Sequence, residues 1–117
     1  MAERTYDHQE LRGLGASLSQ WDGYQTTQGR LDLLRKSIGE DHRFLDIRSQ
    51  INHEGAPKYV AHDVLAELKK FELVSQYMRT FYHELDAQKP DEAKLKQDLE
   101  GILDCLKKKG LKGKKKK

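Results

Sequence analysis

The sequence has few of the features that mark an enzyme, a secreted protein or a membrane protein. It contains one cysteine and two prolines among 117 residues, and none of its apolar runs approaches the roughly 18 residues that a membrane span needs. A single cysteine, Cys105, excludes an internal disulfide and a thiolate metal site, and it fits a reducing compartment. Residues 1–10 have no apolar stretch typical of a secretion signal. We therefore expect a soluble cytoplasmic protein.

Signals for β-strands are also scarce. Valine and isoleucine are few, and no segment alternates apolar and polar residues over six positions. Apolar residues make up 36% of the chain, which is enough for one compact core. We expect an all-α fold, a compact bundle of five to six short helices formed by residues 1–110, followed by a flexible lysine-rich tail over residues 111–117.

Six segments place apolar residues at steps of three and four, which is typical of helices. In the second segment Thr26 and Thr27 are candidate N-caps, and Gly39 is expected to end the helix in the left-handed conformation. Pro57 suits the first turn of the fourth helix, and Ser75 is the expected N-cap of the fifth. The predicted helices cover residues 6–21, 26–38, 41–55, 57–71, 75–85 and 90–110.

The net charge of +3 is unevenly distributed along the chain. Eight of the 22 basic residues are lysines that follow Leu106, with no acid among them. Residues 1–106 therefore carry 14 bases against 19 acids, a balance of −5. The basic character belongs to the tail, which is typical of a solvated chain end with weak, unselective attraction to phosphates.

No constellation of catalytic or metal-binding residues is present. The five histidines each lie next to an acid, but the Glu-x-x-His and His-Glu-x-x-His spacings of metal sites are absent. Gly13 and Gly15 lack the third glycine and the preceding strand of a dinucleotide loop. Cys105 is distant in sequence from its nearest histidine, His83, and is expected to be a buried apolar thiol. We expect no enzymatic activity, no metal, no cofactor and no small-molecule substrate.

One helix face could instead contact a phosphate chain. In the fifth predicted helix the apolar side takes Met78, Phe81, Tyr82 and Leu85, and the opposite side carries donors and no acid. We therefore expect a nucleic-acid-binding surface. Its candidate residues are Gln76, Arg79 and His83 on that helix, Lys69 and Lys70 on the fourth, and Arg35, Lys36 and Arg43 on the second and third, where Arg30 is also expected to be available.

Arg48 has an unusual position in the predicted third helix. Helical angles place it between Phe44, Leu45 and Ile51, inside the apolar arc. An unpaired buried charge would cost several kcal/mol. We therefore expect Arg48 either to meet a carboxylate or to lie at an interface with another protein.

Residues 58–88, KYVAHDVLAELKKFELVSQYMRTFYHELDAQ, form an apolar-striped helix, a short join and an aromatic helix. This pair resembles two helices in the small, all-helical subunit of type III CRISPR effector complexes, in which a Leu-Thr-Thr-Ser-x-Leu-Arg stretch opens the second helix. Leu73, Ser75, Met78 and Arg79 fall on the leucine, the second threonine, the last leucine and the arginine of that stretch. Val74 and Gln76 stand where the family has hydroxyl residues, and the family continues with a longer helical half than residues 90–110 provide.

The resemblance implies a role in antiviral defence as part of a ribonucleoprotein complex. Subunits of the family stack beside one another and touch the backbone of the target strand with basic side chains, which makes Arg79, Lys69 and Lys70 the residues carried over. The implied partners are RNA, neighbouring copies of the chain and other effector subunits. Guide pairing would then supply the sequence specificity.

Two other functions stay open. A helix-turn-helix DNA regulator would use residues 60–71 as the first helix and 75–87 as the reading helix, with Gln76 and Arg79 at base edges. The join lacks the glycine often found in that turn, and the reading helix would be unusually apolar. A helical adaptor that binds another protein through an apolar face is compatible with the composition but is indicated by no particular residue.

Overall fold

The computed structural model describes residues 6–111, and for residues 103–111 only the course of the helix. The expected all-α fold is confirmed, with no strand in this part of the chain. The side chains of Cys105 and Leu106, and the tail from residue 112, lie outside the described residues. The helices are α1 (His8–Gln20), the short 3₁₀ helix η1 (Asp22–Gln25), α2 (Thr27–Ile38), α3 (Phe44–Ser49), α4 (Pro57–Lys70), α5 (Val74–Glu84) and α6 (Pro90–Leu111).

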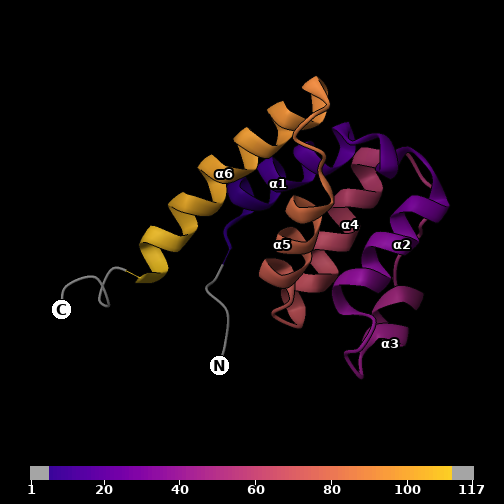
Figure 1. The fold of residues 1–117 in the computed structure, drawn as a ribbon. Helices are drawn as coiled ribbons and strands as arrows, with labels where there is room; N and C mark the ends of the chain where they lie inside the picture. Colours follow the sequence, from indigo (N-terminus) through magenta and orange to yellow (C-terminus); the bar gives the residue numbers. More distant parts are fainter. Residues whose placement is uncertain (1–5, 112–117) are drawn as a thin grey trace.

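The helices pack as neighbouring pairs around one core (Figure 1). α1 lies against α4, α2 lies against α5, and α6 runs along α1 at the edge of the bundle. In Figure 1 α2 and α4 both run toward the lower end of the view, and α5 starts there. The C-terminal turns of α2 and α4 and the start of α5 are therefore at the same end of the molecule.

The core consists of the inward stripes of these helices. On α4, Val60, Val64 and Leu68 recur every four residues and are at most 2% exposed. Pro57 occupies the first turn of this helix, as predicted, where its missing N–H would have no intrahelical partner. Each fully buried side chain of this size contributes about 1.5–3 kcal/mol to folding. The core is completed by the buried residues of the other helices, among them Leu14, Leu18, Leu33, Leu34, Ile38, Ile47, Phe81 and Leu99.

The join between α4 and α5 differs from the prediction. Ser75 is not an N-cap: it lies inside α5, and its hydroxyl meets the hydroxyl of Tyr6. The N-cap residue is Leu73, which has no capping side chain. The chain reverses instead through a Schellman motif, in which the Leu73 amide donates to the Leu68 carbonyl at 3.0 Å and the Glu72 amide to the Lys69 carbonyl at 3.2 Å. Glu72 occupies the left-handed position of this motif with φ 60°.

Gly39 ends α2, but not in the predicted left-handed conformation. Its φ of −61° and ψ of −22° are right-handed, while its amide donates to the Arg35 carbonyl. A Cβ atom at this position would lie 2.3 Å from that carbonyl oxygen. A Cβ atom here would clash with the last turn of α2, which favours glycine at this position. At the other end of α2, Thr26 is the N-cap, as predicted, and accepts a hydrogen bond from the Gly29 amide.

Candidate nucleic-acid interface

Three of the predicted site residues share the outer face of α5. The helix turns Val74, Tyr77, Met78 and Phe81 into the core, which leaves Gln76, Arg79 and His83 exposed on the opposite side. The one acid that α5 contributes to its own surface, Glu84, points to a different side, toward α2. This outer face of α5 therefore presents donors without a carboxylate among them.

The three side chains of this face differ in their contacts with the rest of the protein. The Gln76 amide donates to the Ser37 carbonyl on α2 at 2.6 Å. The His83 ring contacts the Tyr82 ring edge to face, with centroids 5.5 Å apart. Arg79 makes no hydrogen bond or ion pair with any residue that the structure describes, and the same is true of Lys69 at the end of α4. Arg79 and Lys69 are thus two exposed cations that no described carboxylate holds.

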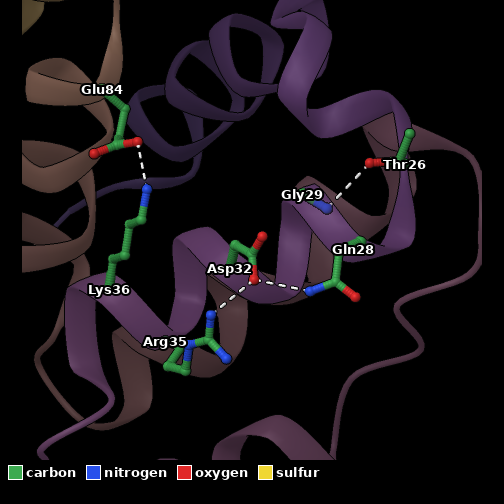
Figure 2. A network of polar contacts seen from close by, with 7 residues as sticks. All are labelled: Thr26, Gln28, Gly29, Asp32, Arg35, Lys36 and Glu84. Carbon is green, nitrogen blue, oxygen red and sulfur yellow. Dashed lines mark hydrogen bonds and ion pairs between the residues drawn. The ribbon is translucent and has the colours of Figure 1, made fainter.

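Three other candidate cations are held in surface ion pairs. Lys36 on α2 meets Glu84 on α5 at 2.9 Å, and Arg35 meets Asp32 within α2 at 3.0 Å, as Figure 2 shows. Lys70 meets Glu67 within α4 at 3.3 Å. The basic side chains of these pairs are 53–67% exposed. Exposed pairs contribute only about 0–1 kcal/mol, so a phosphate could exchange for the carboxylate at little cost.

Arg43 is the most firmly held of the predicted site residues. Its guanidinium donates to both carboxylate oxygens of Asp41 at 2.9 Å and lies 5.2 Å from the centre of the Phe71 ring. Hydrogen bonds from Arg43 lower the pKa of Asp41 to about 2, and the same contact raises the pKa of Arg43. Arg43 therefore joins the segment before α3 to the end of α4, and two of its five guanidinium N–H donors are committed to Asp41.

Four of the predicted cations lie near helix C-termini. Arg35 and Lys36 are in the last turn of α2, and Lys69 and Lys70 are in the last turn of α4. Cations in these positions stabilise a helix because its C-terminal carbonyls carry partial negative charge. The C-terminal ends of α2 and α4, which carry these cations, both lie toward the lower end of the view in Figure 1.

The structure places Arg30 in a different environment from the one predicted, and Arg48 has no carboxylate partner among the described residues. Arg48 is exposed, because α3 ends at Ser49 and presents only Ile47 fully to the core. Arg30, expected on the surface, is only 5% exposed. It lies on the inward stripe of α2, three and four residues before Leu33 and Leu34, and that spacing was the signal available in the sequence.

Arg30 is satisfied by backbone carbonyls. Its guanidinium donates to the carbonyl oxygens of Tyr24 at 2.6 Å, His53 at 2.7 Å and Gly55 at 2.9 Å. It also lies 5.8 Å from the centre of the Tyr24 ring. Arg30 thereby fixes η1 and the segment between α3 and α4 to α2, so it belongs to the scaffold and not to the interface.

The comparisons with known proteins identify no family for this chain, and the described residues form no metal site. Within the described residues, no group of three or more histidine, cysteine, aspartate and glutamate side chains could hold a metal ion. No helix there is both long and apolar enough to cross a membrane. The chain matches no protein-family model, and it has no significant match to a curated protein or a solved structure.

Proposed function

We propose that this chain is a non-catalytic subunit that binds the sugar-phosphate backbone of single-stranded RNA within a larger RNA-guided complex of the type III CRISPR kind. The observation that carries the proposal is the outer face of α5, where Arg79 is exposed and has no partner in the described part of the chain. The resemblance of residues 58–88 to the small subunit of those complexes supports the proposed membership of such a complex.

Backbone binding suits this face better than base reading. Sequence readout needs side-chain amides and guanidinium groups free to meet base edges. The Gln76 amide is occupied by the Ser37 carbonyl, so one of the two candidate base-reading side chains is engaged inside the protein. Arg79, Lys69 and His83 can still supply charge and donors to phosphate oxygens, which positions a strand without reading its sequence.

The acidic balance of residues 1–106 predicts weak RNA binding by an isolated copy. Residues 1–106 have a balance of −5, which opposes long-range attraction to RNA. We expect Kd values in the range of roughly 10⁻⁴ to 10⁻⁶ M at physiological salt, typical of unspecific backbone contacts. Strong binding would then require neighbouring subunits that bind the same strand.

The proposal is tested by fluorescence anisotropy of the full chain with a labelled single-stranded RNA of mixed sequence. The double variant Arg79→Ala/Lys69→Ala should bind about thirtyfold more weakly, because each of the two lost phosphate contacts costs on the order of 1 kcal/mol. The slope of log Kd against log salt should also decrease by about 1.4, since each contact to a single strand contributes about 0.7.

The matched control is Arg12→Ala/Lys94→Ala, which removes the same charge from exposed positions on α1 and α6. It should leave the salt slope unchanged, and circular dichroism should show unchanged helicity for both double variants. Equal weakening by both pairs would show that RNA responds only to net charge and would overturn the proposal. Tighter binding to duplex DNA of the same length would favour the helix-turn-helix function instead.

A further inference from the structure

A second surface feature is an open hollow of about 560 Å³ that is bordered by α2, α3 and the segment after α3. Its apolar wall is formed by Leu31, Leu45 and Ile51, and Arg48 borders it. Leu45 is 68% exposed, one of only two large hydrophobic side chains with such exposure in the described residues. Volumes of about 300–1,000 Å³ are typical of small-ligand sites.

The wall of this hollow is held in place by buried contacts. The Arg30 guanidinium donates to the carbonyl oxygens of His53 and Gly55 and so ties the segment after α3 to α2. The His53 ring in turn hydrogen-bonds the Arg48 carbonyl at 2.8 Å through Nε2. The shape of the hollow therefore depends on contacts behind its surface.

The lining of the hollow contains one cationic donor without a partner among the described residues. The Thr27 hydroxyl donates to the His53 carbonyl and the Ser49 hydroxyl to the Asp46 carbonyl, so both hydroxyl protons are committed. The Arg48 guanidinium has no hydrogen bond or ion pair with a described residue. Glu54 is the one acid in the lining, and it forms no ion pair with Arg48.

We propose that this hollow binds a carboxylate attached to a branched aliphatic group. The planar guanidinium of Arg48 matches the two oxygens of a carboxylate, and such charge-assisted pairs are stronger than neutral hydrogen bonds. Leu31, Leu45 and Ile51 would cover the aliphatic group and remove it from water. A free branched-chain acid and the C-terminal leucine of a peptide both carry this chemistry. The inference is independent of the RNA-binding face of α5.

The test is an NMR titration of the isotopically labelled full chain with 4-methylpentanoate and, separately, with N-acetyl-leucine. Saturable shifts are expected at the methyl groups of Leu31, Leu45 and Ile51, with a Kd on the order of 1 mM for ligands of this size. Saturation by only the first ligand assigns the site to a free acid. Saturation by N-acetyl-leucine assigns it to a peptide C-terminus.

The controls remove one part of the recognition at a time. The matched uncharged ligands, 4-methylpentanol and N-acetyl-leucinamide, should bind at least about tenfold more weakly, as should both acids to Arg48→Gln. Glu54→Gln should strengthen binding by about twofold because it removes a repulsive charge.

Three results would overturn the proposal: no saturable shift with either acid, equal binding of the charged and uncharged ligands, or no effect of Arg48→Gln. If Arg48→Gln instead weakens RNA binding as Arg79→Ala does, Arg48 is a phosphate contact and the proposed ligand is wrong. The first three results are measured without RNA and do not depend on whether the outer face of α5 binds it, so the two proposals can fail separately.

Discussion

The hydroxyl groups of Tyr24 and Tyr77 share a hydrogen bond of 3.0 Å in the centre of the core. The two residues are 53 positions apart, and each side chain is wholly buried. The bond joins η1 to α5, the helix that carries the candidate interface. Each hydroxyl would otherwise be a buried polar group without a partner, which costs about 1–3 kcal/mol.

This pair predicts strong coupling between two conservative substitutions. Tyr24→Phe and Tyr77→Phe should each lower the free energy of unfolding by about 1–2 kcal/mol, because each leaves the other hydroxyl unpaired. The double variant should cost less than the sum, since it removes both polar groups at once. Urea unfolding of the four proteins measures the coupling, and strictly additive effects would show that the hydroxyls do not interact.

The same pair predicts loss of stability at alkaline pH. Burial raises the pKa of Tyr24 to about 12 and that of Tyr77 well above its usual value. Above pH 10 the unfolded chain releases tyrosine protons that the folded chain retains, so the free energy of unfolding falls as pH rises from about 10 to 12. Urea unfolding between pH 8 and 12 measures this slope, which should be shallower in the double phenylalanine variant.

Substitutions of two arginines should differ in how much they lower the free energy of unfolding. Arg30→Ala leaves three backbone carbonyls without their donor and should lower the free energy of unfolding by at least about 2 kcal/mol. Arg48→Ala, at an exposed position, should change it by less than about 0.5 kcal/mol. Thermal unfolding of both variants distinguishes them, with Arg30→Lys as a milder change if Arg30→Ala does not fold. Equal effects would contradict the assignment of Arg30 as the structural residue.

The left-handed Glu72 offers a stabilising substitution. A non-glycine residue with positive φ costs about 1–2 kcal/mol, and glycine does not bear this cost. Glu72→Gly should therefore raise the free energy of unfolding by about 1 kcal/mol relative to Glu72→Ala, which removes the carboxylate but keeps the Cβ atom. Urea unfolding compares the two variants. A glycine variant that is no more stable than the alanine variant would contradict the backbone strain assigned to position 72.

The helical architecture was predictable because most inward stripes follow one regular period. The stripe of Val60, Val64 and Leu68 and the first-turn Pro57 gave the position of α4 closely. The donor face of α5 followed from the same periodicity, since a strongly apolar side fixes what lies opposite. The core position of Tyr77 was not predicted, because a tyrosine carries a polar hydroxyl. Its buried partner Tyr24 lies in η1, outside the predicted helices.

The predictions were wrong where a helix ends earlier than its apolar pattern suggests, or where contacts between distant residues replace local ones. The predicted third helix was too long, and the six-residue α3 places Arg48 in solvent while Ile51 enters the core from the following segment. Ser75 is a favourable N-cap residue, but the reversal before α5 depends on the hydrogen bonds of Glu72 and Leu73 instead. Lys36 pairs with Glu84, 48 residues away, which no local pattern could indicate.

The most direct measurement is the NMR footprint of a single-stranded RNA on the isotopically labelled full chain. If α5 carries the contact, the largest shifts will occur at Gln76, Arg79 and His83, followed by Lys69, and they will decrease with added salt. Shifts confined to the lysines from residue 107 onward, with the α5 resonances unmoved, would show that the tail alone binds RNA and would contradict the proposed function.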